Sequence, residues 1–155
     1  METGDGLNQV YLMKGGSETE MRRALARILP AGTRLVEFSD PRDALGRLAI
    51  LPERIRLSEN AEFSPGITVI VSSEEHGQLE QLAHLPAGVI TCGLSSKDTV
   101  TFSSRLDDRA VVSLLRSLEG ARGTIEPMDL PVCCPSDCGA YPLLAAAAAK
   151  IFLEG

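Results

Sequence analysis

The run Ile67-Thr-Val-Ile-Val71 constrains the fold of this chain more than any other segment. Its residues are all β-branched and nearly all apolar, and the run is too short for a helix. Such runs are typical of a parallel strand that is covered on both faces. Since helices must then lie on both sides of the sheet, the run predicts an α/β fold.

The first half of the chain alternates predicted strands and helices. Residues 9–13 and 33–38 have strand composition, and apolar residues at helical spacing predict a helix over 18–29. Ser17 is the expected N-cap of that helix, with Glu20 completing a capping box. Asp40-Pro41 is expected to cap a second helix, whose apolar face would be formed by Ala44, Leu45, Leu48 and Ala49.

The second half predicts strands at residues 89–92 and 99–102, joined by a turn at 94–98. Residues 110–118 fit a helix or a strand, whereas prolines at 127 and 131 make residues 125–132 extended. A helix follows over 141–153. We therefore predict one domain over residues 1–155. It has a three-layer fold: a mainly parallel central sheet flanked by helices, with antiparallel strands added in the second half.

Charge and hydropathy exclude several partners. The chain has 15 Lys and Arg against 21 Asp and Glu, so its net charge of −6 argues against nucleic acid and anionic membranes. Arg22, Arg23 and Arg27 form a local basic cluster, which we interpret as a solvated helix face. Residues 1–8 lack the apolar core of a signal peptide, and no apolar run reaches the roughly 20 residues of a membrane span. These features predict a cytoplasmic protein with reduced cysteines.

The turn Lys14-Gly-Gly-Ser17 is the first candidate site. It lies between the first strand and the first helix, where nucleotide-binding folds place a phosphate loop. Gly15, Gly16, Ser17 and Thr19 are therefore candidate ligand-binding residues. A plain structural turn is the alternative, because Glu18 compensates the helix dipole and would repel a phosphate.

Ser72, Glu75 and His76 form the second candidate site, since they follow the strand at 67–71 at the expected carboxyl edge of the sheet. A Ser–His or Glu–His pair could act in catalysis. The alternative is that Ser72 or Ser73 caps a short helix. No third member of a catalytic set is visible, so we assign no catalytic residue.

The cysteines Cys92, Cys133, Cys134 and Cys138 do not have the paired spacing typical of a zinc site. We therefore predict neither a metal nor a cofactor. Gly93, directly after Cys92, is expected to supply an unusual backbone angle in a turn.

Residues 68–155 resemble the central domain of the Mur ligases, the bacterial family that joins amino acids to peptidoglycan precursors using ATP. The family's strand and acidic turn correspond to residues 69–76, and its I-T-F-G-L pattern corresponds to Ile90-Thr-Cys-Gly-Leu94. Its Gly-His-Asn turn and Ala-rich helix correspond to residues 136–149. More weakly, the Gly-Gly turn near the N-terminus is similar to the family's phosphate loop.

The resemblance also shows departures from the family pattern. The phosphate-loop lysine corresponds to Glu18, although Thr19 stands at the position of the magnesium-binding hydroxyl. The His and Asn of the later turn have no counterpart, and we expect the family's two flanking domains to be absent. Phosphoryl transfer needs positive charge at the phosphates, so these departures favour a protein that is not an enzyme.

Three functional hypotheses follow from these observations. The first is a non-catalytic, Mur-ligase-like binding, regulatory or assembly module, which would self-associate or bind a protein partner. The second is a small enzyme with a site at the strand carboxyl ends, or a subunit of a heteromeric ATP-dependent ligase. The third is a cysteine-based metal or redox module.

Overall fold

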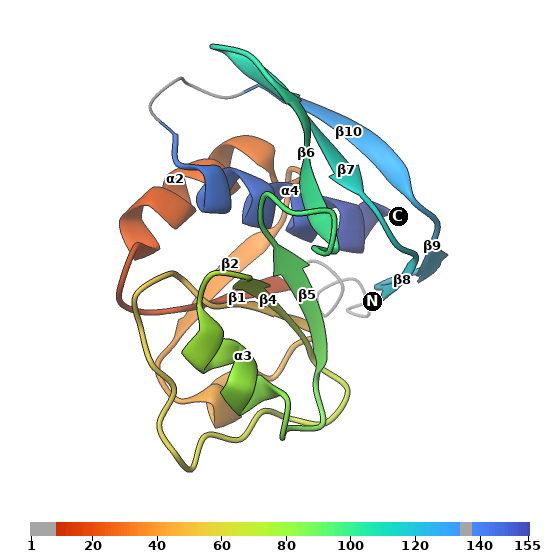
Figure 1. The fold of residues 1–155 in the computed structure, drawn as a ribbon. Helices are drawn as coiled ribbons and strands as arrows, with labels where there is room; N and C mark the ends of the chain where they lie inside the picture. Colours follow the sequence, from red (N-terminus) through yellow and green to blue (C-terminus); the bar gives the residue numbers. More distant parts are fainter. Residues whose placement is uncertain (1–8, 134–137) are drawn as a thin grey trace.

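The computed structural model describes residues 9–133 and 138–155, which form two sheets and three α-helices (Figure 1). The strands are β1 (Gln9–Met13), β2 (Arg34–Phe38), β3 (Leu48–Ile50), β4 (Thr68–Ser72), β5 (Gly88–Cys92), β6 (Val100–Arg105), β7 (Arg109–Leu114), β8 (Leu118–Gly120), β9 (Gly123–Ile125) and β10 (Met128–Cys133). The helices are α2 (Glu18–Ile28), α3 (His76–Leu82) and α4 (Ala140–Glu154), with a short 3-10 turn, η1 (Pro41–Asp43). None of the described helices is long and apolar enough to cross a membrane.

The main sheet has eight strands in the order β10-β7-β6-β5-β4-β3-β1-β2. The strands from β2 to β6 are parallel, β7 runs antiparallel to β6, and β10 runs antiparallel to β7. Strands β8 and β9 form a separate antiparallel hairpin. The predicted α/β fold, with a mainly parallel sheet and antiparallel strands added in the second half, is confirmed.

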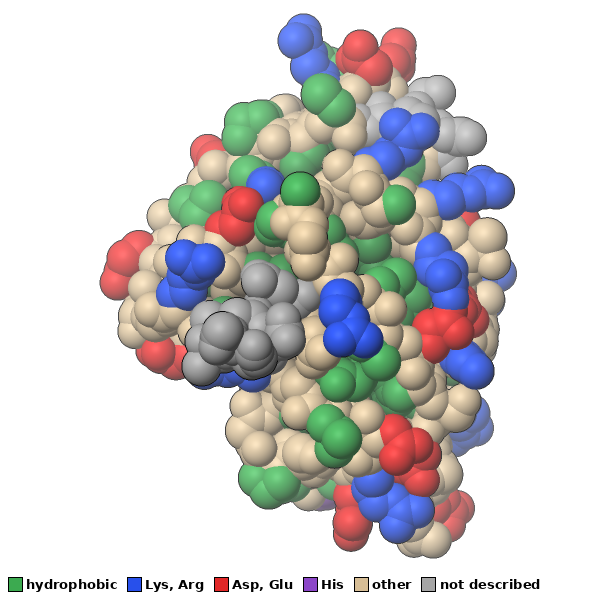
Figure 2. Space-filling view, turned by 180° about the vertical axis from the view of Figure 1, so that it is seen from behind, with side chains coloured by type: hydrophobic (Ala, Val, Ile, Leu, Met, Phe, Trp, Pro, Cys, Tyr) green, Lys and Arg blue, Asp and Glu red, His purple; other side chains and the backbone are tan. Residues whose placement is uncertain are grey.

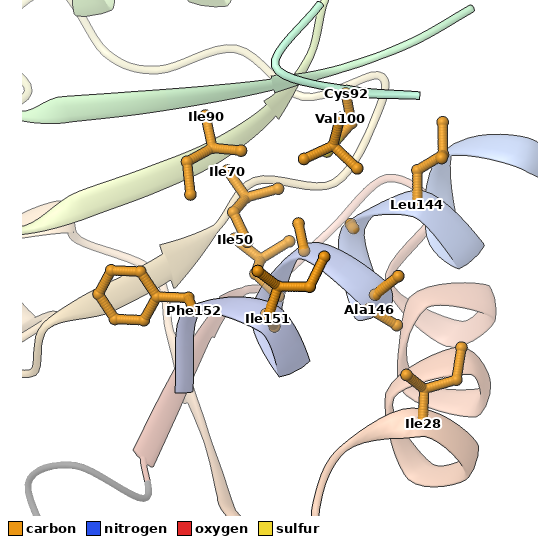
Figure 3. Close-up of a cluster of buried hydrophobic side chains, with 14 of the residues drawn as sticks. Ile28, Ile50, Ile70, Ile90, Cys92, Val100, Leu144, Ala146, Ile151 and Phe152 are labelled. Carbon is orange, nitrogen blue, oxygen red and sulfur yellow. The ribbon is translucent and has the colours of Figure 1, made fainter. Parts of the chain in front are cut away.

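Helices α2 and α4 cover one face of the sheet. Ile50, Ile70 and Ile90 are register neighbours on adjacent strands, and their side chains point toward α4 (Figure 3). Helix α4 is apolar on every side and buried along nearly its whole length, because it packs against α2 as well as the sheet. This accounts for its run of alanines, which lets the surrounding elements approach closely.

Helix α3 and residues 51–66 cover the opposite face only in part. On that face Ala49, Val69 and Val89 are register neighbours, and the first two are fully buried. Val89 is 36% exposed, so the cover ends between β4 and β5. The two faces together give the predicted three layers, with the third layer confined to the parallel half of the sheet.

The helix predicted after Asp40-Pro41 is wrong. Only η1 forms there, Leu45 is 74% exposed, and Leu48–Ile50 is the strand β3. The spacing of the apolar residues fits a helix, but β3 lies between β1 and β4 and is buried on both faces. Pairing with two neighbours therefore overrides the local pattern. The ambiguous segment at 110–118 is not helical: β7 ends within it at Leu114, and β8 begins at Leu118.

Candidate functional site

The order of the strands places the candidate site between β1 and β3. The chain passes from β1 to β2 on one side and then returns to β3 on the other side of β1. In open α/β sheets, ligands bind beyond the carboxyl ends of the strands at this kind of reversal. The relevant segments are the turn at 14–17, after β1, and the segment at 52–55, after β3.

The turn after β1 holds a carboxylate of its own. Gly15 and Gly16 have positive φ angles of 111° and 54°, which glycine adopts without strain. The Gly15 N–H donates to Glu18 Oε1 at 3.0 Å, and Arg22 Nε donates to Glu18 Oε2 at 3.1 Å. The Gly15 hydrogen bond lowers the pKa of Glu18, against an opposing effect of burial and with help from Arg22. An internal anion therefore takes the N–H that a phosphate loop would offer to its ligand.

The segment at 52–55 fills the space beside this turn. The Glu53 N–H donates to Ser17 Oγ at 3.1 Å. A Cβ atom added to Gly16 would lie 2.0 Å from the Glu53 carbonyl oxygen, and one added to Gly15 would lie 3.1 Å from the Ile55 side chain. The predicted capping box is wrong, because the Ser17 hydroxyl accepts from this segment and makes no cap hydrogen bond to the helix. Thr19 is exposed on the first turn of α2.

Helix α3 holds the same segment from its other side. The Arg54 N–H donates to Glu75 Oε2 at 3.2 Å. The buried Gln78 side chain donates to the carbonyl oxygens of Pro52 and Ile55, at 3.1 and 2.8 Å. The two predicted clusters are therefore connected through residues 52–55, which lie between them.

Ser72, Glu75 and His76 do not converge on one point. Ser72 is buried, and its hydroxyl accepts from the Glu74 N–H at 3.3 Å. Glu75 binds Arg54, whereas His76 is exposed as the first residue of α3. Within the described residues, no hydrogen bond joins Ser72 to His76. The predicted serine cap is also wrong, because Glu75 stands at the N-cap position of α3 and makes no cap hydrogen bond through its side chain.

Ser72 instead lines a small cleft between the strand ends and the start of α4. The cleft has a volume of about 60 Å³ and is lined by Glu53, Ser72, Glu74, Cys92, Gly93, Leu94, Ala140, Tyr141 and Leu144. That volume holds a few water molecules. Pockets that bind cofactors or drug-sized ligands measure roughly 300–1,000 Å³, so this cleft cannot take a nucleotide.

Burial is the largest cause of the pKa shifts of Glu53 and Cys92, which line the cleft. It raises the pKa of Glu53, with the nearby Arg54 opposing and the carboxylates of Glu75, Glu20 and Glu74 reinforcing the shift. Burial also raises the pKa of the Cys92 thiol, with a smaller contribution from Asp98. A thiol in this state is protonated at neutral pH and is a poor nucleophile.

Tyr141 fixes the start of α4 onto the strand ends. Its hydroxyl donates to the Leu51 carbonyl oxygen at 2.6 Å and lies 3.3 Å from the Ile70 carbonyl oxygen. Burial raises the pKa of Tyr141 well above its ordinary value. The role of Tyr141 was not visible in the sequence, where Tyr141 only marked the beginning of a helix.

Gly93 and Asp98 organise the neighbouring turn after β5. Asp98 is 2% exposed, and its Oδ2 accepts from the Ser95 N–H at 3.0 Å. A Cβ atom on Gly93 would lie 2.2 Å from Ser73 Oγ and 2.5 Å from Asp98 Oδ2. The predicted unusual angle at Gly93 is wrong, since its φ is not positive and the glycine is required for space. The turn itself was predicted at residues 94–98, and it is present, with the Asp98 N–H donating to the Ser95 carbonyl oxygen at 3.0 Å.

The cysteines lie in different environments. Cys92 is buried, Cys133 is exposed and Cys138 is half-buried, while Cys134 lies outside the described residues. Across residues 9–133 and 138–155, no three His, Cys, Asp or Glu side chains are grouped so that they could hold a metal ion.

Comparison with known proteins supports the fold. No protein-family model and no curated protein matches the chain. Among solved structures, a murein peptide ligase, Mpl, from Psychrobacter arcticus is similar, with a TM-score of 0.55 and 10% sequence identity. The match covers 98% of this chain and 46% of the ligase, so the chain spans about half the length of that protein. At this identity the similarity concerns the fold alone: the chain has a Mur-ligase-like fold.

Proposed function

We propose that this chain is a non-catalytic, Mur-ligase-like module that works through protein contacts in the cytoplasm, in assembly or regulation. The observation that carries the proposal is the filled space at the strand reversal. The Glu53 main chain donates a hydrogen bond to Ser17 and lies against Gly16, and the Glu18 carboxylate accepts a hydrogen bond from the Gly15 N–H. A nucleotide phosphate would have to displace both.

Electrostatics supports the same proposal. A transferring phosphoryl group needs fixed positive charge around its oxygens. The turn supplies a carboxylate from Glu18, and Glu53 and Glu74 line the adjacent cleft. Arg22, the cation that binds Glu18, is also paired with Glu37. The local charge is therefore unfavourable for a triphosphate.

The enzymatic alternatives lack comparable support. A catalytic site at Ser72, Glu75 and His76 would need the three side chains to meet, yet Ser72 and Glu75 accept hydrogen bonds from the main chain of different segments. A ligase subunit working with another chain would need that chain to supply the phosphate loop, because Glu18 and Glu53 occupy the turn at residues 14–17 of this chain.

Calorimetry with magnesium-ATP tests the proposal on the full chain. We expect no saturable heat up to millimolar nucleotide and no release of phosphate. Micromolar affinity together with turnover would refute a non-catalytic function.

The variant Glu18→Lys separates the effect of the negative charge in the turn from the effect of the space filled by residues 52–55. It restores the family's lysine at this position but leaves residues 52–55 in place, so we expect it to remain unable to bind magnesium-ATP. Tight binding by this variant would mean that charge alone closes the turn, which would contradict the argument from the filled space.

A further inference from the structure

The two edges of the main sheet differ in how they are protected. At one edge, β10 contains the exposed Pro131, which has no N–H. Proline is a common means of preventing an edge strand from pairing with another chain. At the other edge, β2 has the sequence Arg-Leu-Val-Glu-Phe, without proline or bulge. Only the second edge offers an uninterrupted main chain.

The register shows which groups of β2 face outward. The Phe38 carbonyl accepts from the Lys14 N–H on the β1 side. Because N–H and C=O groups alternate in direction along a strand, Val36 also faces β1, while Leu35 and Glu37 face away. Within the described residues, no hydrogen bond engages the outward main-chain groups of Leu35 and Glu37.

A groove runs beside this edge on the side of α2. It has a volume of about 570 Å³, and its lining includes Arg22, Arg23, Leu25, Ala26, Leu29 and Leu35. Most of the lining is apolar, and Arg23 adds a positive charge to it, whereas Arg22 is paired with Glu18 and Glu37. An extended segment paired with β2 would direct every second side chain into the groove.

The charge of the groove contrasts with that of the whole chain, which is −6. Arg23, Arg27 and Arg34 are exposed and, within residues 9–133 and 138–155, make no ion pair. Viewed from behind, Lys and Arg side chains gather on the side of the molecule that holds α2 (Figure 2). The basic cluster interpreted as a solvated face thus borders both a groove and an unprotected edge.

We propose that β2 and the α2 groove bind an extended acidic segment of a partner protein by strand addition. The outward groups of Leu35 and Glu37 supply main-chain hydrogen bonds, the apolar lining takes alternate apolar side chains, and the arginines select acidic residues between or beside them. This inference rests on the proposed function as a protein-binding module and names the chemistry of its partner.

The test uses the full ¹⁵N-labelled chain and a probe peptide of alternating valine and aspartate. In the free chain, the amides of Leu35 and Glu37 should exchange with solvent faster than those of Val36 and Phe38. Adding the peptide should shift and protect the Leu35 and Glu37 amides. A peptide of alternating valine and lysine should bind at least about tenfold more weakly.

The variant Arg23→Glu should weaken binding of the acidic peptide by about threefold to tenfold, since it reverses one exposed charge. Arg122→Glu is the matched control, because it makes the same charge change at an exposed residue in the β8–β9 turn and should leave binding unchanged.

Several outcomes would overturn the inference. These are equal binding of both peptides, no binding at millimolar peptide, or slow exchange at Leu35 and Glu37 in the free chain. Protection that grows with protein concentration alone would assign the edge to a second copy of this chain. None of these results tests the proposal that the chain is non-catalytic, because the magnesium-ATP titration tests that proposal separately.

Discussion

The turn after β1 and the turn after β5 lie at the same edge of the sheet, and each holds one of its own carboxylates against a main-chain N–H. In the first turn Glu18 binds Gly15 with a side chain that is 22% exposed. In the second, Asp98 binds Ser95 and is 2% exposed. The same local bond is therefore peripheral in one turn and buried in the other.

The two turns also differ in what holds them in place. The first turn is fixed by another segment, since Glu53 contacts both Ser17 and Gly16. The second is fixed by its own residues and by Arg116, which donates to the carbonyl oxygens of Asp98 and Ser96 at 2.5 and 3.3 Å. Stability should therefore depend on close packing in the first turn and on the carboxylate in the second.

The substitution Gly16→Ala should give the largest effect. The new methyl group would lie 2.0 Å from the Glu53 carbonyl oxygen, and a main-chain atom cannot move aside as a side chain can. We expect unfolding free energy to fall by about 3 kcal/mol, the upper end for overpacking, as measured by urea denaturation.

Gly77→Ala is the matched control for this variant. Gly77 lies in α3, and a Cβ atom there meets nothing within 4 Å. Alanine should stabilise the helix by roughly 0.5–1 kcal/mol. A Gly16→Ala variant as stable as the wild type would show that residues 52–55 do not lock the first turn.

The substitution Asp98→Ala should rank second. It removes a buried, charged acceptor and leaves the Ser95 N–H without its partner. A hydrogen bond to a charged group contributes about 2 kcal/mol, so urea denaturation should show a loss of that order. Asp107→Ala, at an exposed position between β6 and β7, should change stability little. Equal effects of Asp98→Ala and Asp107→Ala would show that the buried carboxylate of Asp98 does not stabilise the turn after β5.

Much of this fold could be predicted because the signals are local. The β-branched run gives β4, and Pro142 followed by an unbroken apolar series gives α4. Strand β3 could not be predicted, since its three residues have helical spacing and become a strand only by pairing with β1 and β4.

The candidate site was less predictable, because its main contacts join distant parts of the chain. The location of both turns at one edge follows from the parallel strands. The bond between Glu53 and Ser17 spans 36 residues, and the bond between Tyr141 and Leu51 spans 90. No periodicity or motif in a single sequence records such a contact. The local bond between Gly15 and Glu18 was misassigned for a different reason: capping statistics favour Ser17 and Glu20 as the paired residues.

The substitution Glu18→Ala should give the smallest loss, roughly 0.5 kcal/mol, because its carboxylate is near solvent. The sign of its pH dependence follows from the lowered pKa of Glu18 in the folded state. The stabilisation of the folded state by the Glu18 carboxylate is fully present above its ordinary pKa of 4.5, and it disappears as pH falls through the lowered pKa. The melting temperatures of wild type and variant, measured by thermal denaturation, should therefore differ at pH 7 and converge in strong acid.

Glu20→Ala is the matched control, because Glu20 lies in the same helical turn and makes no hydrogen bond to the turn among the described residues. It loses only the interaction with the helix dipole, so it should cost less stability. A Glu18→Ala loss as large as that of Asp98→Ala, or one independent of pH, would mean that the first turn depends on its own carboxylate as much as the second does.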